Sequence, residues 1–195
     1  MRNSFMMRAI ALAAIAWATV PCAQAAFTFT IDQVGNDVVV TGAGTLDLSL
    51  LAPFRTIKLN SSDINPNSAE IAIDPVATMT VYQGINGPTS FTNTTGEYLA
   101  SSTAGYAIAL FGFSQEIAVD SSYVSGTSVA NTATFTGATL AEMGLTPGTT
   151  YSYTFGFGGS AEPNELTVVV VPEPRSSLLL ITGSALLLFV CIRRR

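Results

Sequence analysis

Apolar and polar residues alternate along several short stretches of the chain, and this alternation predicts β-strands. Phe27, Phe29 and Ile31 are separated by polar residues, and a period of two is typical of a strand with one buried face. The run Gly35-Asn36-Asp37 follows and predicts a turn between two strands. The strands expected from such patterns are 27–31, 38–41, 46–50, 71–73, 77–82, 106–113, 129–135, 151–157 and 166–171.

Turn signals separate these stretches, and helical signals are almost absent. Proline, glycine and asparagine interrupt the chain at 65–67, 87–88 and 147–148, and only residues 140–143 read as a single helical turn. Many short strands with regular turns predict an all-β fold, and we expect an antiparallel β-sandwich, jelly-roll-like, over residues 26–171. A closed barrel and an immunoglobulin-like arrangement are the alternatives.

The first 25 residues have the pattern of a signal peptide. Two arginines precede the largely apolar run 9–20, and small residues follow at Ala23 and Ala25, so we expect cleavage before Ala26. A permanent anchor is the alternative, but this run is short for a membrane span. The pattern therefore predicts export of the residues that follow.

A second apolar stretch, residues 176–192, ends in Arg193, Arg194 and Arg195. A helix of this length reaches about 25 Å, which crosses a bilayer when flanking arginines extend to the interface. A basic tail favours the cytoplasmic side. We therefore expect a transmembrane helix that leaves residues 26–171 outside the cytoplasm.

The motif Pro172-Glu173-Pro174 stands directly before this stretch. Pro-Glu-Pro, an apolar helix and a basic terminus over residues 172–195 resemble the PEP-CTERM sorting domain. The resemblance implies processing by exosortase, a membrane-embedded transpeptidase-like enzyme, and an association with exopolysaccharide in Gram-negative bacteria. Two prolines also hold the chain extended and outside any helix, so the motif would stay accessible above the membrane.

A looser resemblance covers the end of the expected β domain. Thr134 to Leu140, Gly144 to Tyr151 and Leu166 to Val168 are similar to the ending found in many PEP-CTERM proteins, with Phe155 and Phe157 where tryptophan is common. This similarity implies a family-typical ectodomain and brings no catalytic residue with it.

The charge of the expected ectodomain excludes nucleic acid as a partner. All thirteen acidic residues but only two of the eight basic ones lie in 26–174, which gives this part a net charge of about −11. Such a surface repels phosphate backbones. The two cysteines, Cys22 and Cys191, lie in the terminal segments, so the ectodomain has neither a disulfide nor a thiol nucleophile.

Candidate catalytic residues are few. The chain has no histidine, which removes Ser-His-Asp and Cys-His arrangements and the usual zinc sites, and we expect no cofactor. Glu97, Glu116 and Asp120 could serve a carboxylate hydrolase, but nothing in the sequence brings them together. We therefore expect no enzyme, with a carboxylate-based hydrolase as the least favoured alternative.

One loop has oxygen ligands with the spacing of a calcium site. The candidates at positions 1, 3, 5 and 12 of that pattern are Asp63, Asn65, Asn67 and Asp74. Ser68 replaces the glycine of the sharp turn, and the last ligand is Asp rather than the longer Glu. We therefore expect no metal and keep these four residues as weak candidates.

These observations favour a non-catalytic cell-surface or extracellular-matrix protein. Its expected partners are the membrane, signal peptidase, exosortase and exopolysaccharide. The alternative is a carbohydrate-binding module, with or without calcium, which would hold sugar rings on exposed aromatic side chains. We expect the alternating aromatics of 151–157 to face the core, and the sequence leaves Tyr82, Tyr98, Tyr106 and Tyr123 undecided.

Overall fold

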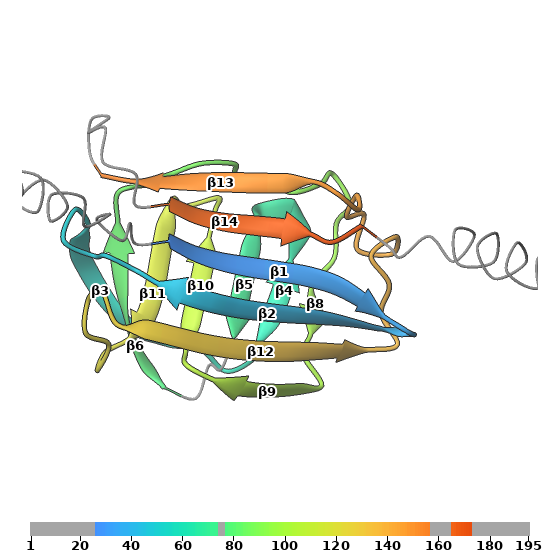
Figure 1. The fold of residues 1–195 in the computed structure, drawn as a ribbon, viewed down its shortest axis with the longest axis horizontal. Coiled ribbons are helices and arrows are strands. Elements are labelled where there is room, and N and C mark those ends of the chain that lie inside the picture. Colours follow the sequence, from blue (N-terminus) through green and yellow to red (C-terminus); the bar gives the residue numbers. More distant parts are fainter. Residues whose placement is uncertain (1–25, 74–76, 157–164, 173–195) are drawn as a thin grey trace, which may run out of the picture.

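The computed structural model describes residues 26–73, 77–156 and 165–172, which form two β-sheets stacked face to face (Figure 1). The predicted all-β class is confirmed. Within the described ranges there is no α-helix, and one turn of 3₁₀ helix, η2 (Pro66–Ser68), joins two strands. The expected turn at 140–143 is present, because the Met143 N–H donates to the Thr139 carbonyl (3.1 Å).

The first sheet contains both ends of the described domain. Its order is β7 (Ile85–Asn86), β13 (Thr150–Phe155), β14 (Glu165–Val170), β1 (Ala26–Val34), β2 (Asp37–Thr45), β12 (Ser128–Thr136) and β9 (Ser102–Gly105). β1 and β14 pair in parallel, with Thr28 opposite Thr167, whereas every other described pairing is antiparallel. The expected antiparallel arrangement therefore holds for all described pairs except this one.

The second sheet runs behind the first. Its order is β3 (Ala52–Lys58), β6 (Thr78–Gln83), β11 (Glu116–Asp120), β10 (Ile108–Phe111), β5 (Glu70–Ile73), β4 (Asp63–Asn65) and β8 (Tyr98–Leu99). Figure 1 shows these strands running across those of the first sheet rather than along them. The arrangement is that of crossed sheets, whose inner faces share one core.

The shared core is built from the alternating apolar positions that predict the strands. Phe27 and Phe29 are fully buried, and their rings meet edge to face with centroids 5.0 Å apart. The second sheet contributes Ile71, Ile108 and Leu110 to the same cluster. Alternation along each strand therefore places one face inside and leaves the other for solvent or for a further layer.

The outer face of the second sheet is apolar as well. Four alanines, a methionine and a valine form a second buried cluster there: Ala72, Met79, Val81, Ala107, Ala109 and Ala118. Ile57 of β3 and Leu59 just after it pack against this cluster. β3 and β4 lie far apart in the sheet but are joined by only four residues, 59–62, so this connection crosses the sheet. We call β3 and residues 59–62 the strap.

The expected strand at 46–50 is wrong. Leu46 and Leu48 are buried, but their N–H groups donate to the Tyr123 hydroxyl (3.0 Å) and the Ser125 hydroxyl (2.8 Å) rather than to a neighbouring strand. Their alternation therefore comes from a loop that side chains hold against the core. Six described strands were not expected from the sequence pattern: β3, β4, β7, β8, β9 and β11.

Candidate functional site

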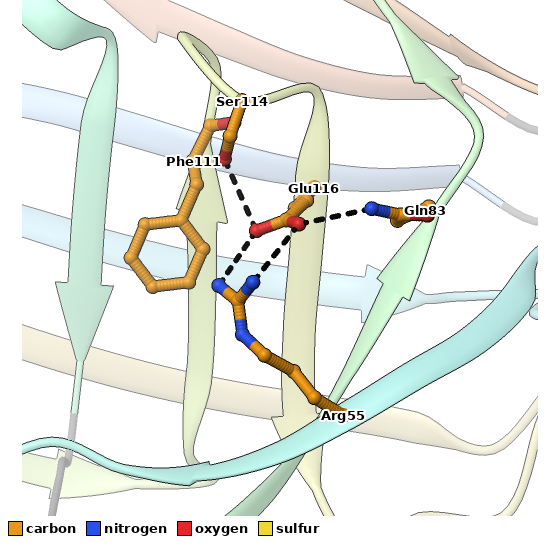
Figure 2. A network of polar contacts seen from close by, with 5 residues as sticks. All are labelled: Arg55, Gln83, Phe111, Ser114 and Glu116. Carbon is orange, nitrogen blue, oxygen red and sulfur yellow. Dashed lines mark hydrogen bonds and ion pairs between the residues drawn. The ribbon is translucent and has the colours of Figure 1, made fainter.

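A polar cluster lies on the outer face of the second sheet, where the strap meets β6 and β11 (Figure 2). Arg55 of β3 forms two parallel bonds to Glu116, from Nη1 to Oε1 (3.3 Å) and from Nη2 to Oε2 (2.9 Å). Gln83 Nε2 donates to Oε1 (3.3 Å), and the Ser114 hydroxyl donates to Oε2 (3.1 Å). Glu116 is thus the centre of four hydrogen bonds.

A β-bulge in β3 brings Arg55 to this position. The register of β3 against β6 shifts between Pro53 and Arg55, so Phe54 is the extra residue. The Phe54 ring lies 5.2 Å from the Arg55 guanidinium carbon and is 55% exposed. Figure 2 shows the Phe111 ring beside the ion pair on the same face. Aromatic side chains therefore border the polar cluster.

The hydrogen-bonding capacity of Glu116 is filled within the cluster, whereas that of Arg55 is not. Glu116 is buried, and each of its two oxygens accepts two hydrogen bonds. Arg55 is about half exposed, at 46%, and a guanidinium has five N–H donors, of which Glu116 takes two. Its remaining donors and the Phe54 ring are the groups that could meet a ligand.

A group of carboxylates lies on the same sheet near its other edge. Asp63 of β4 is buried, and burial, with the charges of Glu70 and Glu97, raises its pKa to about 7. Burial also raises the pKa of Glu70. Asp63 pairs with Ala72 and Asn65 pairs with Glu70, so these side chains occupy neighbouring positions of β4 and β5. The sequence alone gave no signal for this group, because it comes from three separate segments.

The calcium candidates are only partly placed together. Asp63 and Asn65 belong to β4 and Asn67 lies in η2, whereas Asp74 is outside the described residues. The Asn65 Oδ1 atom is buried and has no hydrogen-bond partner. In the part of the chain that the structure describes, no three acidic, histidine or cysteine side chains are grouped so that they could hold a metal ion.

The acids considered for hydrolysis are not brought together. Glu116 and Asp120 lie on the same strand, four residues or about 13 Å apart. Glu97 precedes β8 at the sheet edge, and β10, β5 and β4 separate that edge from β11. A carboxylate pair acting on one glycosidic bond needs a much closer approach, and these three residues do not supply it.

The aromatic residues of β13 face inwards, as expected. Tyr153 and Phe155 are buried, and the Tyr153 hydroxyl donates to the Pro88 carbonyl (2.7 Å). Tyr151 is half-buried against Phe91, whereas Phe157 is outside the described residues. The other tyrosines are partly buried too, and the exposed aromatic rings of the described chain are Phe54 and Phe113, at 55% and 75%.

A shallow hollow of about 630 Å³ opens between β8 and the end of β12. Its wall includes Glu97, Leu99 and Glu142, and the Tyr98 hydroxyl closes one side by donating to the Glu142 carbonyl (2.6 Å). Asp63 does not line it. The buried carboxyl group therefore has no open path to a substrate in this hollow.

The expected processing residues lie at the limits of the described chain. Ala26 is the first residue of β1, and Pro172 follows β14 by two positions. Ala23, Ala25, Glu173, Pro174, Arg193, Arg194 and Arg195 are outside the described residues, as are the expected signal peptide and span. A search of the described residues finds no helix with the length and apolar character to cross a membrane.

We compared the chain with protein-family models, curated proteins and solved structures. The chain matches no protein-family model, no curated protein and no solved structure. The polar cluster, the limits of the β domain and the free edges of its sheets are therefore the observations from which function can be inferred.

Proposed function

We propose that this chain is a non-catalytic, exported cell-surface or extracellular-matrix protein that carries a PEP-CTERM sorting signal and is processed by exosortase. The observation that supports it most is the extent of the β domain. β1 begins at Ala26, the expected new N-terminus, and β14 ends at Val170, two residues before the Pro-Glu-Pro motif. The described strands thus lie within the interval between the two expected cleavage regions.

The exit of the chain from the sheet fits a processing site. The Val171 N–H donates to the Ile31 carbonyl (2.9 Å), which continues the pairing of β14 with β1 by one residue. Pro172 has no N–H and cannot extend that pairing. The motif therefore starts at the residue where the chain leaves the sheet, and an enzyme could reach it without unfolding the domain.

The site chemistry also favours a role other than catalysis. Glu116 accepts four hydrogen bonds from side chains of the protein, which leaves its carboxylate little capacity to bind a substrate. The outer face of the first sheet is uncharged over its middle, where Thr30, Thr41 and Thr132 stand side by side on three strands. A neutral hydroxyl-bearing face suits a hydrated polysaccharide matrix.

We also infer a jelly-roll-like sandwich as the finer description of the fold. The core shared by two stacked sheets supports it. The two sheets hold fourteen described strands, six more than the eight of a plain jelly roll, and the parallel β1–β14 pair and the short edge strands β7 and β8 would be among the elaborations.

The test is the intact mass of the protein from membrane and culture-medium fractions of cells with and without exosortase. We expect a form that starts at Ala26 and ends near Pro172 to Pro174 only when exosortase is present. A variant with alanine at 172, 173 and 174 should keep its C-terminus in both strains. An uncleaved C-terminus of the unmodified protein in both strains would contradict the proposal.

A carbohydrate-binding module is the second candidate, and the exposed rings of Phe54 and Phe113 favour it. The Phe54 ring lies over Arg55 of the polar cluster, and Phe113 directly precedes Ser114 of that cluster in the chain. Sugars bind to aromatic faces flanked by hydrogen-bond donors. Retention on an exopolysaccharide preparation should fall when both rings are changed to alanine. Val124→Ala, which removes an equally exposed apolar side chain elsewhere, should leave retention unchanged.

A further inference from the structure

The edge strand β9 lacks the protection that the other sheet edges have. It forms the free edge of the first sheet beside β12, and all four of its residues are exposed (Figure 1). Its residues, Ser-Thr-Ala-Gly, have small, uncharged side chains. Strands of this kind present unpaired backbone donors and acceptors to any other strand that approaches.

The register shows which backbone groups of β9 face outwards. The Tyr106 N–H donates to the Ala130 carbonyl (3.0 Å), and the same register places Ala104 opposite Thr132. In an antiparallel pair every second residue is hydrogen-bonded to the partner strand. Ala104 is two residues from Tyr106, so its backbone N–H and carbonyl also point towards β12. The N–H and carbonyl of Thr103 therefore point away from the sheet.

The other edges are blocked or very short. β3, at one edge of the second sheet, contains Pro53, a β-bulge, Arg55 and Lys58, all of which hinder pairing with another strand. β7 and β8 have only two residues each. The contrast makes β9 the edge in the described chain that is best able to accept a further strand.

The surroundings of β9 favour a second copy of this chain as that strand. Residues 98–115 and 121–141, which include β9 and β12, contain no Asp, Glu, Lys or Arg, although the ectodomain is strongly acidic. These two segments therefore bring no like charge to the pairing of two copies along this border. A strand paired antiparallel with its own copy across a two-fold axis matches itself, and isologous pairing of this kind is the commonest symmetry of protein assemblies.

We propose that β9 pairs antiparallel with β9 of a second copy, with Thr103 at the two-fold axis, so that the two first sheets join into one. Each Thr103 N–H would donate to the carbonyl of its counterpart. The interface is small and contains little apolar area, so we expect a weak dimer that becomes populated as the protein concentration rises. The pairing does not depend on the proposed sorting.

Cysteine cross-linking in intact cells tests this geometry. In full-length protein with Cys22→Ser and Cys191→Ser, Thr103→Cys places two thiols next to the axis, and Thr41→Cys places them on the exposed face of a central strand. A mild oxidant should give a disulfide-linked dimer at least about tenfold more abundant for Thr103→Cys. Equal cross-linking of the two variants would overturn the proposal.

Thr103→Pro supplies a second, independent test. Since the Thr103 N–H faces outwards, proline removes the donor between copies without removing a bond inside the sheet. Sedimentation of the purified full-length protein in detergent should show dimer formation weakened about tenfold by Thr103→Pro and unchanged by Thr103→Val, which keeps the N–H. A dimer equally stable in both variants, or no dimer in the unmodified protein at any concentration, would reject β9 pairing.

Discussion

The outer faces of the two sheets differ in what covers them. On the first sheet, threonines and small residues such as Thr41 and Ala43 are exposed, and the centre of the face is uncharged. On the second sheet, Ala109 and Ala118 are fully buried under the strap, which Arg55 pins to Glu116. The outer face of the first sheet is therefore open to solvent, whereas that of the second is partly covered by the end of its edge strand β3 and the connection that follows.

This difference in cover explains why burial disfavours the charged form of a carboxylate on the second sheet. A covered face removes water from any carboxylate at its border, and Asp63, next to the end of the strap, is 7% exposed. The described residues include only two cations, Arg55 and Lys58, and Arg55 forms an ion pair with Glu116. Asp63 is instead more stable in its protonated form, so we expect the stability of the second sheet to depend on pH.

The largest expected effect is the pH dependence of stability. Folding raises the pKa of Asp63 from 3.8 to about 7, so between these values the folded state binds more protons than the unfolded state. This contribution to the free energy of unfolding is complete below about pH 4, decreases as pH rises and is lost above about pH 7, for a total on the order of 4 kcal/mol. Chemical denaturation from pH 4 to 8 measures it.

Asp63→Asn separates this explanation from general acid effects. The amide cannot ionise, so the variant should match the unmodified protein near pH 4 and exceed its stability above pH 7. Glu70→Gln removes one of the charges that raise the pKa of Asp63 and should give a shallower dependence. The same slope in all three proteins would show that Asp63 is not its source.

The sequence predicted the first sheet better than the second, for a physical reason. β1 and β12 have one buried and one open face, so their residues alternate and the pattern is readable. β10 and β11 are buried on both faces, and β3 is exposed along nearly its whole length. Neither case produces alternation, so β11 and β3 were missed and β10 was placed only approximately.

The sequence did not predict the candidate site, because the residues that form it are far apart in the chain. Arg55 and Glu116 are 61 positions apart, and only the bulge at Phe54 and the pairing of β6 with both partners bring them together. Glu116 could be identified as an acid but not as a buried one. By contrast, Pro172, Glu173 and Pro174 form a contiguous motif, which a sequence shows directly.

Removing the Arg55–Glu116 ion pair should have the next largest effect on stability. Arg55→Ala leaves the buried Glu116 carboxylate with only Gln83 and Ser114 as partners, and we expect a loss of about 2–3 kcal/mol in the free energy of unfolding. Lys58→Ala, at the exposed end of the same strand, should change stability by less than about 0.5 kcal/mol. Equal effects of the two would mean that the ion pair does not hold the strap.

A matched pair of substitutions compares the two faces directly. Ala109→Leu inserts a large side chain beneath the strap and should cost about 2 kcal/mol, because buried alanines there allow the close approach. Ala43→Leu makes the same change on the exposed face of the first sheet and should cost less than about 0.5 kcal/mol. Similar thermal midpoints for both variants would contradict a covered second sheet.

The smallest effect on stability separates a structural from a binding role at the strap. Phe54 is more than half exposed and its ring contacts Arg55, so Phe54→Ala should lower stability by no more than about 1 kcal/mol. If the ring binds sugars, retention on exopolysaccharide falls severalfold in this nearly stable variant. If retention is unchanged while Arg55→Ala still destabilises the protein, the polar cluster serves only to fasten the strap, and the contrast between the two faces is one of architecture alone.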